Sequence, residues 1–281
     1  PGYDGFLDVK GVPPWIPNGL SVWEFGTGED PEAKAANDYD QRTKNPRNVD
    51  PASATFVFVT PRPWQGATRT AFVAARQAEG KWADVVVVDA VDLEVWLDDH
   101  EAVAARFATN VLRLMPQHDV RSALDFWDEY AARFRGRLTE QVVIAGRSDE
   151  ADQVRKLLAA KASRIVVRGD SRDEALAFVL AALRTGDPGL RHFVESRALV
   201  VDTEGAARGV SHRSDLVIGM RSAAAESAGL LLERGNSVIL PLGNDAPNQR
   251  DAIRLRRPTR AEFGEALKTM AAYIELNCVR A

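Results

Sequence analysis

The stretch that could carry chemistry most directly is SVWEFGTGEDPEAKAANDYDQR, in which Glu24 ends an otherwise apolar run. The segment after it carries Lys34, Asp38 and Arg42 at four-residue spacing, which places their side chains on one face of a helix. A buried carboxylate without a partner is strongly unfavourable, so Glu24 requires a metal ion or a base beside it. The alternative interpretation is a hairpin edge followed by a salt-bridged surface row.

Asp4 stands at the start of the first predicted strand, and Glu24 ends its hairpin partner. Two carboxylates from neighbouring strands can converge on one Mg²⁺ or Mn²⁺, since such hard cations prefer oxygen ligands; the main-chain carbonyl of Phe25 would be a third ligand. The metal would polarise a phosphoryl oxygen and lower the pKa of a bound water. The Lys34 ammonium would neutralise transition-state charge. The set predicts phosphodiester hydrolysis with Asp4, Glu24 and Lys34 as catalytic residues.

The elements that must position this set lie in residues 1–116, which we expect to form one α/β domain. The third and fourth strands are uninterrupted apolar runs, which are typical of strands buried inside a sheet. Asp30 is a candidate N-cap and Pro31 a candidate first helical residue. The pattern predicts strands at 4–12, 19–26, 54–61 and 84–90, and helices at 30–44, 68–80 and 93–115, the last of them broken at least once.

The order Asp4, hairpin, Glu24-Phe25-Gly26, helix, buried strand, helix, buried strand resembles the PD-(D/E)XK restriction-endonuclease-like superfamily. The last strand, followed by Asp89-Ala90, is similar to the branch related to methyl-directed restriction enzymes. The stretch from Trp23 to Thr43 is similar to nuclease domains attached to bacterial anti-phage or STAND-type NTPases. The resemblance covers about residues 1–115. It implies a mixed sheet flanked by helices, a magnesium-dependent deoxyribonuclease and DNA as partner.

Two departures from the family pattern concern the lysine and the N-terminus. The family's lysine usually follows the second carboxylate by two residues, where this chain has Gly26. Lys34 on the next helix is the best match, and Lys10 is the second. The helix that precedes the first strand in the family has no counterpart here, so we expect it upstream of Pro1. A basic group that could meet DNA phosphates, or form a solvated loop, comprises Arg42, Lys44, Arg47 and Arg62.

Residues 117–138 are expected to form a connecting helix, and residues 139–281 a second α/β domain. Short β-branched runs alternate with helical stretches there, which indicates βαβ units and a mostly parallel, Rossmann-like or P-loop-like sheet. The predicted strands are residues 141–146, 164–169, 198–202, 216–220 and 237–243.

A nucleotide site is suggested where a strand, a tight loop and a helix follow one another at Gly169 and Ser171. Asp202 ends the next strand and would be the magnesium ligand. The pattern GxxxxGK[ST] is absent, and Asp170 and Asp173 would repel a triphosphate. We therefore expect a degenerate domain that resembles STAND NTPases, with Gly169, Ser171 and Asp202 as its nucleotide-binding candidates.

Composition indicates a globular protein of 281 residues, 45% hydrophobic and 27% charged, with a net charge of −4. The first 100 residues carry 9 Lys and Arg against 16 Asp and Glu, a balance of −7, which argues against a non-specific nucleic-acid coat. The single cysteine, Cys278, excludes an internal disulfide framework. No apolar run of membrane-spanning length and no signal-peptide pattern is present, so we expect a cytoplasmic protein without membrane contact.

The functional expectation is a metal-dependent DNA endonuclease that forms the effector portion of a longer bacterial antiviral defence protein. Two alternatives stay open. The nuclease fold could be a catalytically inactive interaction or assembly module, or the C-terminal domain could be a nucleotide or small-ligand sensor. Both are compatible with a homo-oligomer and with further domains of the same chain as partners.

Overall fold

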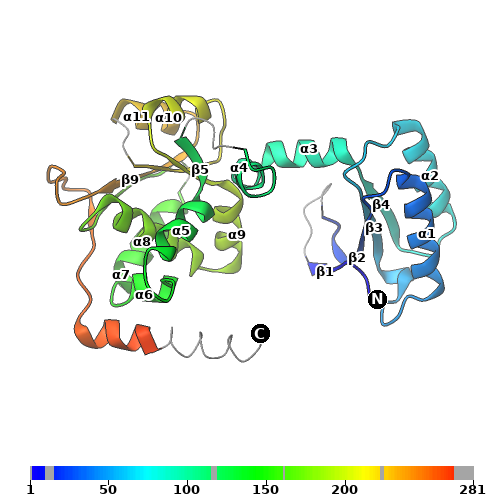
Figure 1. Cartoon of the computed structure of the whole chain (residues 1–281), viewed down its shortest axis with the longest axis horizontal. Helices are drawn as coiled ribbons and strands as arrows, with labels where there is room; N and C mark the ends of the chain where they lie inside the picture. Colours follow the sequence, from blue (N-terminus) through cyan, green and yellow to red (C-terminus); the bar gives the residue numbers. More distant parts are fainter. Residues whose placement is uncertain (1, 10–15, 115–118, 161, 222–224, 269–281) are drawn as a thin grey trace. The chain divides into compact units, whose positions relative to one another are not determined.

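The computed structural model divides the chain into two compact units, Pro1–Asp99 and His100–Ala281, each with its own sheet (Figure 1). Lys10, the second lysine candidate, and Cys278 lie outside the described part of the chain. The structure describes residues 2–9, 16–114, 119–160, 162–221 and 225–268.

The first unit contains a four-stranded mixed sheet in the order β1-β2-β3-β4, and its strands lie in the four stretches predicted as strands. β1 pairs antiparallel with β2, and β2, β3 and β4 run parallel. The strands are β1 (Gly5–Val9), β2 (Gly19–Phe25), β3 (Thr55–Val59) and β4 (Asp84–Val88), and the helices are α1 (Pro31–Lys44), the short η1 (Pro51–Ser53), α2 (Gly66–Ala78) and α3 (Ala90–Asp99).

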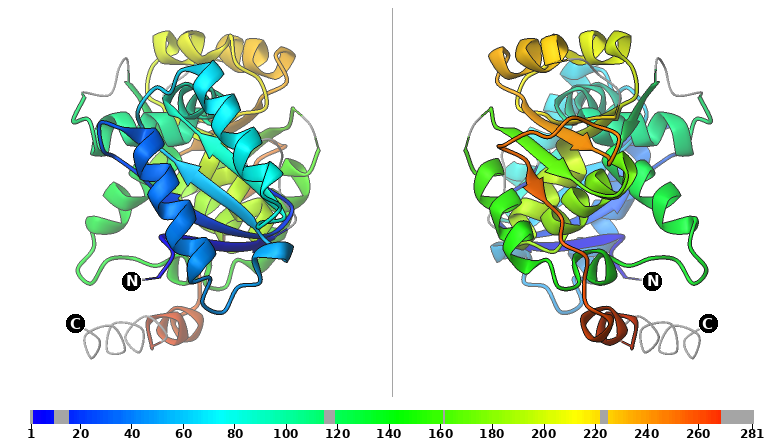
Figure 2. Two further views of the ribbon diagram at one scale, coloured as in Figure 1. Left: turned by 90° about the vertical axis from the view of Figure 1, so that its right-hand side faces the viewer. Right: turned by 90° about the vertical axis from the view of Figure 1, so that its left-hand side faces the viewer.

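The helix α1 carries the charged row at 34, 38 and 42. Asp30 caps it, since its carboxylate accepts a hydrogen bond from the backbone N–H of Ala33 at 2.9 Å, and a proline follows at the first helical position. Ala35 and Tyr39 anchor the helix to the sheet, where the Tyr39 and Phe56 rings meet edge to face at 5.5 Å. α2 packs on the same sheet face through Phe72 (Figure 2).

The second unit contains a six-stranded sheet in the order β10-β6-β9-β8-β7-β5. All strands are parallel to their neighbours except β5, which pairs antiparallel with β7. The strands are β5 (Val120–Ser122), β6 (Arg164–Arg168), β7 (Ala198–Val201), β8 (Val217–Met220), β9 (Ser237–Leu242) and β10 (Ile253–Arg254).

Helices cover both faces of this second sheet, so the α/β class predicted from the alternating pattern holds for both units. One face packs against α5 to α9, and the other against α10 and α11. The core of the first layer is α8, whose residues 175–183 are all buried. The helices are α4 (Glu101–Asn110), α5 (Ala123–Ala132), α6 (Glu140–Ile144), α7 (Ser148–Leu158), α8 (Arg172–Arg184), α9 (Pro188–Arg197), α10 (Glu204–Val210) and α11 (Ala225–Glu233).

Two secondary-structure predictions in this unit were wrong. Residues 141–146 were expected to form a strand, but Glu140–Ile144 is the helix α6, which follows Thr139 and buries Val142 and Val143. β-branched residues favour strands only where a sheet offers a pairing edge, and here packing against α8 decides. The connecting helix expected within residues 117–138 is shorter: α5 begins only at Ala123, because residues 120–122 form the edge strand β5, and it ends at Ala132.

Candidate active site

Glu24 lies at the C-terminal end of β2 with its side chain turned toward α1. It is 2% exposed and shares its sheet face with Val22, two residues earlier, which packs against Ala35 and Tyr39 of α1. The opposite face of β2 carries Trp23, which packs in a separate apolar cluster. The expectation that this carboxylate is buried at a strand end is therefore confirmed.

Asp4 reaches the same strand end from the antiparallel partner. The register pairs Gly5 with Trp23, so the preceding residue of the N-terminal segment lies opposite Glu24. The Asp4 carboxylate accepts a hydrogen bond from the backbone N–H of Phe25 at 2.9 Å, and its charge raises the pKa of Glu24. The hairpin thus brings the two predicted carboxylates together.

The partner of Glu24 is Arg42, which was predicted as a DNA-binding residue. Its guanidinium Nε donates to a Glu24 carboxylate oxygen, and its Nη2 donates to the carbonyl of Gly2 at 2.8 Å. The guanidinium lies 5.1 Å from the centre of the Tyr3 ring. With a side chain only 15% exposed, Arg42 faces into the site, where it offsets the burial of Glu24.

The protonation of Glu24 follows from these neighbours. Burial raises the pKa of this carboxyl above its ordinary value of 4.5. The hydrogen bond and charge of Arg42 lower it, whereas the negative charges of Asp4 and Asp38 raise it further, and the net direction is upward. A cation of higher charge than Arg42 would stabilise the ionised pair of carboxylates, which is what a divalent metal supplies.

Lys34 is delivered to the same face of the sheet from α1. Its ammonium donates to both carboxylate oxygens of Asp38, at 2.6 and 2.5 Å. Its side chain passes over Gly26: a Cβ added at Gly26 would lie 2.9 Å from the Lys34 Cγ. Position 26 lies two residues beyond Glu24 and is the place where the resembled family carries its lysine, so the side chain of Lys34 fills the space that a lysine at 26 would use.

The donor set fits a hard divalent cation. In an extended strand the N–H and C=O of one residue lie on the same edge, so the Phe25 carbonyl faces the side of Asp4. Asp4 and Glu24 supply carboxylate oxygens, and Mg²⁺ commonly keeps several waters beside one or two carboxylates. Among the residues that the structure describes, no group of three or more His, Cys, Asp or Glu side chains could hold a metal ion. The predicted ligand set is these two carboxylates and the carbonyl.

The remaining basic candidates surround this strand end. Arg62 is exposed and its Nε donates to the carbonyl of Thr27 at 3.4 Å, directly after β2. Lys44 is exposed in the last turn of α1. Arg47 is exposed with a left-handed backbone (φ 54°). Burial raises the pKa of Tyr3, and the charge of Arg47 opposes this shift slightly. These three side chains are exposed, whereas Arg42 is paired with Glu24, and a role of the three in DNA binding stays a prediction.

The predicted phosphate loop of the second unit contains an anion of its own. Ser171 is the N-cap of α8, and Gly169 and Asp170 precede it. The Glu174 carboxylate accepts a hydrogen bond from the backbone N–H of Asp170 at 2.7 Å and pairs with the buried Arg147 at 2.8 Å. A carboxylate therefore occupies the N-terminal end of the helix, where a phosphate would bind.

Asp202 is separated from this loop by the strand order. It follows β7, and β9 and β8 lie between β7 and β6, which ends before Gly169. Three strand spacings amount to about 14 Å. Gly169 and Asp202 therefore follow strands that are not neighbours in the sheet, although Ser171 and Asp202 line the same cavity. Nucleotide binding by Gly169, Ser171 and Asp202 stays a prediction.

Asp202 instead belongs to a closed cycle of alternating charges, which we call the arginine–carboxylate ring. Five of its six pairs have N–O separations between 2.6 and 3.1 Å, and the sixth joins Arg121 to Asp202. Around the cycle the members are Arg121, Glu129, Arg133, Asp173, Arg221 and Asp202.

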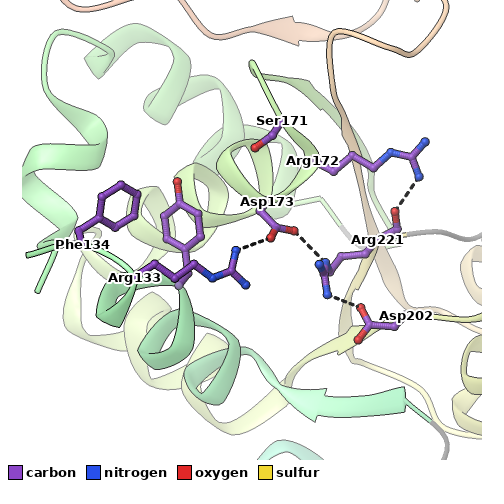
Figure 3. A pocket seen from close by; sticks show the side chains of 8 residues that line it. Arg133, Phe134, Ser171, Arg172, Asp173, Asp202 and Arg221 are labelled. Carbon is purple, nitrogen blue, oxygen red and sulfur yellow. Dashed lines mark hydrogen bonds and ion pairs between the residues drawn. The ribbon is translucent and has the colours of Figure 1, made fainter.

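Four of the six ring members, Arg133, Asp173, Arg221 and Asp202, line an open cavity of about 750 Å³ at the C-terminal ends of β7 and β8 (Figure 3). Tyr130 and Phe134 of α5 and its C-terminal flank line the same cavity, together with Ser171 at the start of α8. Each ring carboxylate touches two arginines and each ring arginine touches two carboxylates, so the ring satisfies its own charges. Every arginine of the ring is therefore already paired with carboxylates, and none is left to bind an anion that enters the cavity.

Sequence reasoning considered Asp38 only as part of a salt-bridged row, and it did not predict the ring as a set. The i, i+4 spacing of Lys34 and Asp38 was the signal for the first. The ring assembles residues from five separate elements or their flanks, and no sequence spacing announces such a set. Comparison with models of known protein families and with curated proteins found no match for this chain. Within the described residues, no helix is long and apolar enough to span a membrane.

Proposed function

We propose that the first unit is a metal-dependent DNA endonuclease of the PD-(D/E)XK restriction-endonuclease-like type. One observation carries the proposal: Asp4 and Glu24 meet at one strand end, and the Lys34 side chain crosses Gly26 on the same sheet face. In this proposal Lys34 of α1 takes the role of the lysine that the family carries two residues after the second carboxylate.

Asp4, Glu24 and the Phe25 carbonyl would hold Mg²⁺ or Mn²⁺. A bound Mg²⁺ would polarise the phosphoryl group and lower the pKa of a coordinated water. Arg42 keeps Glu24 in place through its ion pair, and the Lys34 ammonium provides positive charge for the transition state. Arg62, beside the turn after β2, is placed to contact a DNA phosphate, with Lys44 and Arg47 extending the basic surface.

Plasmid nicking with Mg²⁺ or Mn²⁺ tests this function. We expect cleavage by the wild type and none by Glu24→Ala or Lys34→Ala. Calorimetric titration with Mn²⁺ provides a second readout, in which wild type binds and Glu24→Ala does not. A folded wild type that neither nicks DNA nor binds Mn²⁺ contradicts the proposal and favours the alternative, an interaction or assembly module with a nuclease fold.

The second unit is proposed to serve the nuclease as a scaffold in a longer cytoplasmic defence protein that resembles STAND-type NTPases. The observation that favours a scaffold over a nucleotide sensor is the Glu174 carboxylate at the start of α8. Binding of a nucleotide by this unit, lost on Asp202→Ala, would instead support the sensor.

A further inference from the structure

Asp38 is more deeply buried than the other carboxylates that form a salt bridge with a residue one helical turn away. Its side chain is 7% exposed, whereas the acids of the i, i+4 pairs Arg191–Glu195 and Arg208–Glu204 are 26% and 43% exposed. Exposed pairs of this spacing contribute only about 0.2–0.5 kcal/mol, so they place no strong demand on either partner. A buried carboxylate, by contrast, requires its cation.

Both oxygens of Asp38 are directed at one ammonium group. They lie 2.6 and 2.5 Å from the Lys34 Nζ, so the lysine is held at its tip as well as by its stem. Lysine has a long side chain with about 2 kcal/mol of rotamer entropy, and a bidentate anchor restricts it to one position. The Lys34 side chain is itself 41% exposed, so burial alone would not fix it.

The stem of Lys34 runs through a space that depends on glycine. A Cβ at Gly26 would lie 2.9 Å from the Lys34 Cγ and 2.5 Å from the Phe58 Cζ, closer than real Cβ atoms approach. Gly26 and Glu24 project onto the same sheet face because they are two residues apart in an extended segment. Asp38 also lies within electrostatic range of Glu24.

We propose that Asp38 is the positioning residue of the nuclease site: it fixes the ammonium of Lys34, whose stem passes through the space that Gly26 leaves open. This inference rests on the proposed nuclease function. Asp38 acts through Lys34 and does not itself touch DNA. Its removal leaves the lysine present but unfixed, and a misplaced catalytic group loses much of its effect.

A double-mutant cycle on the nicking rate tests the dependence. We expect Asp38→Asn to slow nicking about 10- to 100-fold, and Lys34→Ala about 100- to 1,000-fold. The double variant Asp38→Asn/Lys34→Ala should be no slower than Lys34→Ala alone, because Asp38 has nothing left to position. DNA affinity measured with Ca²⁺ in place of Mg²⁺ should change less than about twofold, since Asp38 makes no phosphate contact.

The matched control is Asp40→Asn, on the same helix with a carboxylate that is 52% exposed. It should leave nicking unchanged. The proposal would be overturned if the fold-losses in nicking rate of the two single variants multiply in the double variant. It would also be overturned if Asp38→Asn nicks DNA at the wild-type rate.

Amine labelling of the metal-free protein separates this inference from the nuclease function. Acetylation followed by peptide mass spectrometry should show Lys34 reacting several-fold faster in Asp38→Asn than in wild type, with exposed Lys44 as the internal reference. Equal labelling of Lys34 in both proteins overturns the anchoring. If Lys34 reacts faster in Asp38→Asn than in wild type, but the wild type does not cut DNA, then Asp38 holds Lys34 in place and the proposed role in catalysis is overturned.

Discussion

Both units place charged side chains at the C-terminal ends of their parallel strands, but the two clusters differ in how their charges are paired. In the first unit, three carboxylates (Asp4, Glu24 and Asp38) face two cations (Lys34 and Arg42), and among the described residues Asp4 forms no salt bridge. In the second unit, the arginine–carboxylate ring contains three of each sign, and every member has two partners.

This difference indicates which of the two clusters can bind a charged ligand. A closed neutral ring must lose contacts before it can take up an ion, whereas an acidic cluster with a raised carboxyl pKa is stabilised by an added cation. The acidic balance of the N-terminal part, which argued against a non-specific nucleic-acid coat, is consistent with carboxylates concentrated for a metal. The open cluster is therefore the better candidate for chemistry and the closed ring the better candidate for structure.

The largest expected effect is on nicking activity, which should depend on the cluster of the first unit and not on the ring of the second. Glu24→Gln removes a metal ligand and should lower the nicking rate at least about 100-fold. Asp202→Asn, in the ring, should leave the rate within about twofold because it lies in the other unit. Supercoiled-plasmid nicking at matched protein concentration measures both. A reversal of this order would assign the chemistry to the second unit.

The next effect separates the clusters by stability. Arg42→Met leaves the Glu24 carboxylate, 3% exposed, without its ion-pair partner and should destabilise the first unit by about 3 kcal/mol. Arg221→Met leaves Asp173 and Asp202 one arginine each and should cost the second unit about 1 kcal/mol. Hydrogen exchange in increasing urea reads each unit separately. Equal losses of unfolding free energy would mean that the ring depends on Arg221 as strongly as the buried Glu24 depends on Arg42.

Metal binding should stabilise only the first unit. At a Mn²⁺ concentration of 100 times the dissociation constant, the wild type should gain about 2.7 kcal/mol, and Glu24→Gln should gain much less. Thermal unfolding with and without Mn²⁺ measures this gain. Stabilisation that persists fully in Glu24→Gln would place the metal elsewhere.

The pH dependence of that gain follows from the raised pKa of Glu24. Metal competes with the proton for this carboxylate, so the Mn²⁺ effect should decline as pH falls toward and below the raised pKa of Glu24. Without metal, the sign reverses: the folded protein takes up the Glu24 proton at a higher pH than the unfolded chain, so this residue's contribution to stability increases as pH falls through its folded-state pKa. Unfolding midpoints between pH 4 and 8 test both trends.

The smallest effect concerns nucleotides. ATP at millimolar concentration with Mg²⁺ should not change the unfolding midpoint of the second unit, because Glu174 occupies the start of α8 and the ring satisfies its own charges. The variant Glu174→Gln, which keeps the shape and removes the charge, is the sensitised control. A clear ATP shift in wild type would break the comparison and revive the sensor.

The sequence by itself determined the elements and most of the first site. Asp30-Pro31 set the start of α1, apolar runs set β3 and β4, and the strand end at Glu24 followed from its flanking residues. These signals are local, because capping and alternation act over a few residues. Where local preference and packing disagreed, as at Val142 and Val143 in α6, the sequence-based prediction was wrong.

Only the tertiary structure decided which charged residues meet. It paired Arg42 with Glu24 across 18 positions and closed the ring between Arg121 and Asp202 across 81 positions. It also showed that the Lys34 side chain passes over Gly26, where a Cβ would lie 2.9 Å from the Lys34 Cγ. The physical reason is that ion pairing and steric exclusion depend on separations of a few ångströms in space, which strand order and helix packing set and which sequence spacing does not encode.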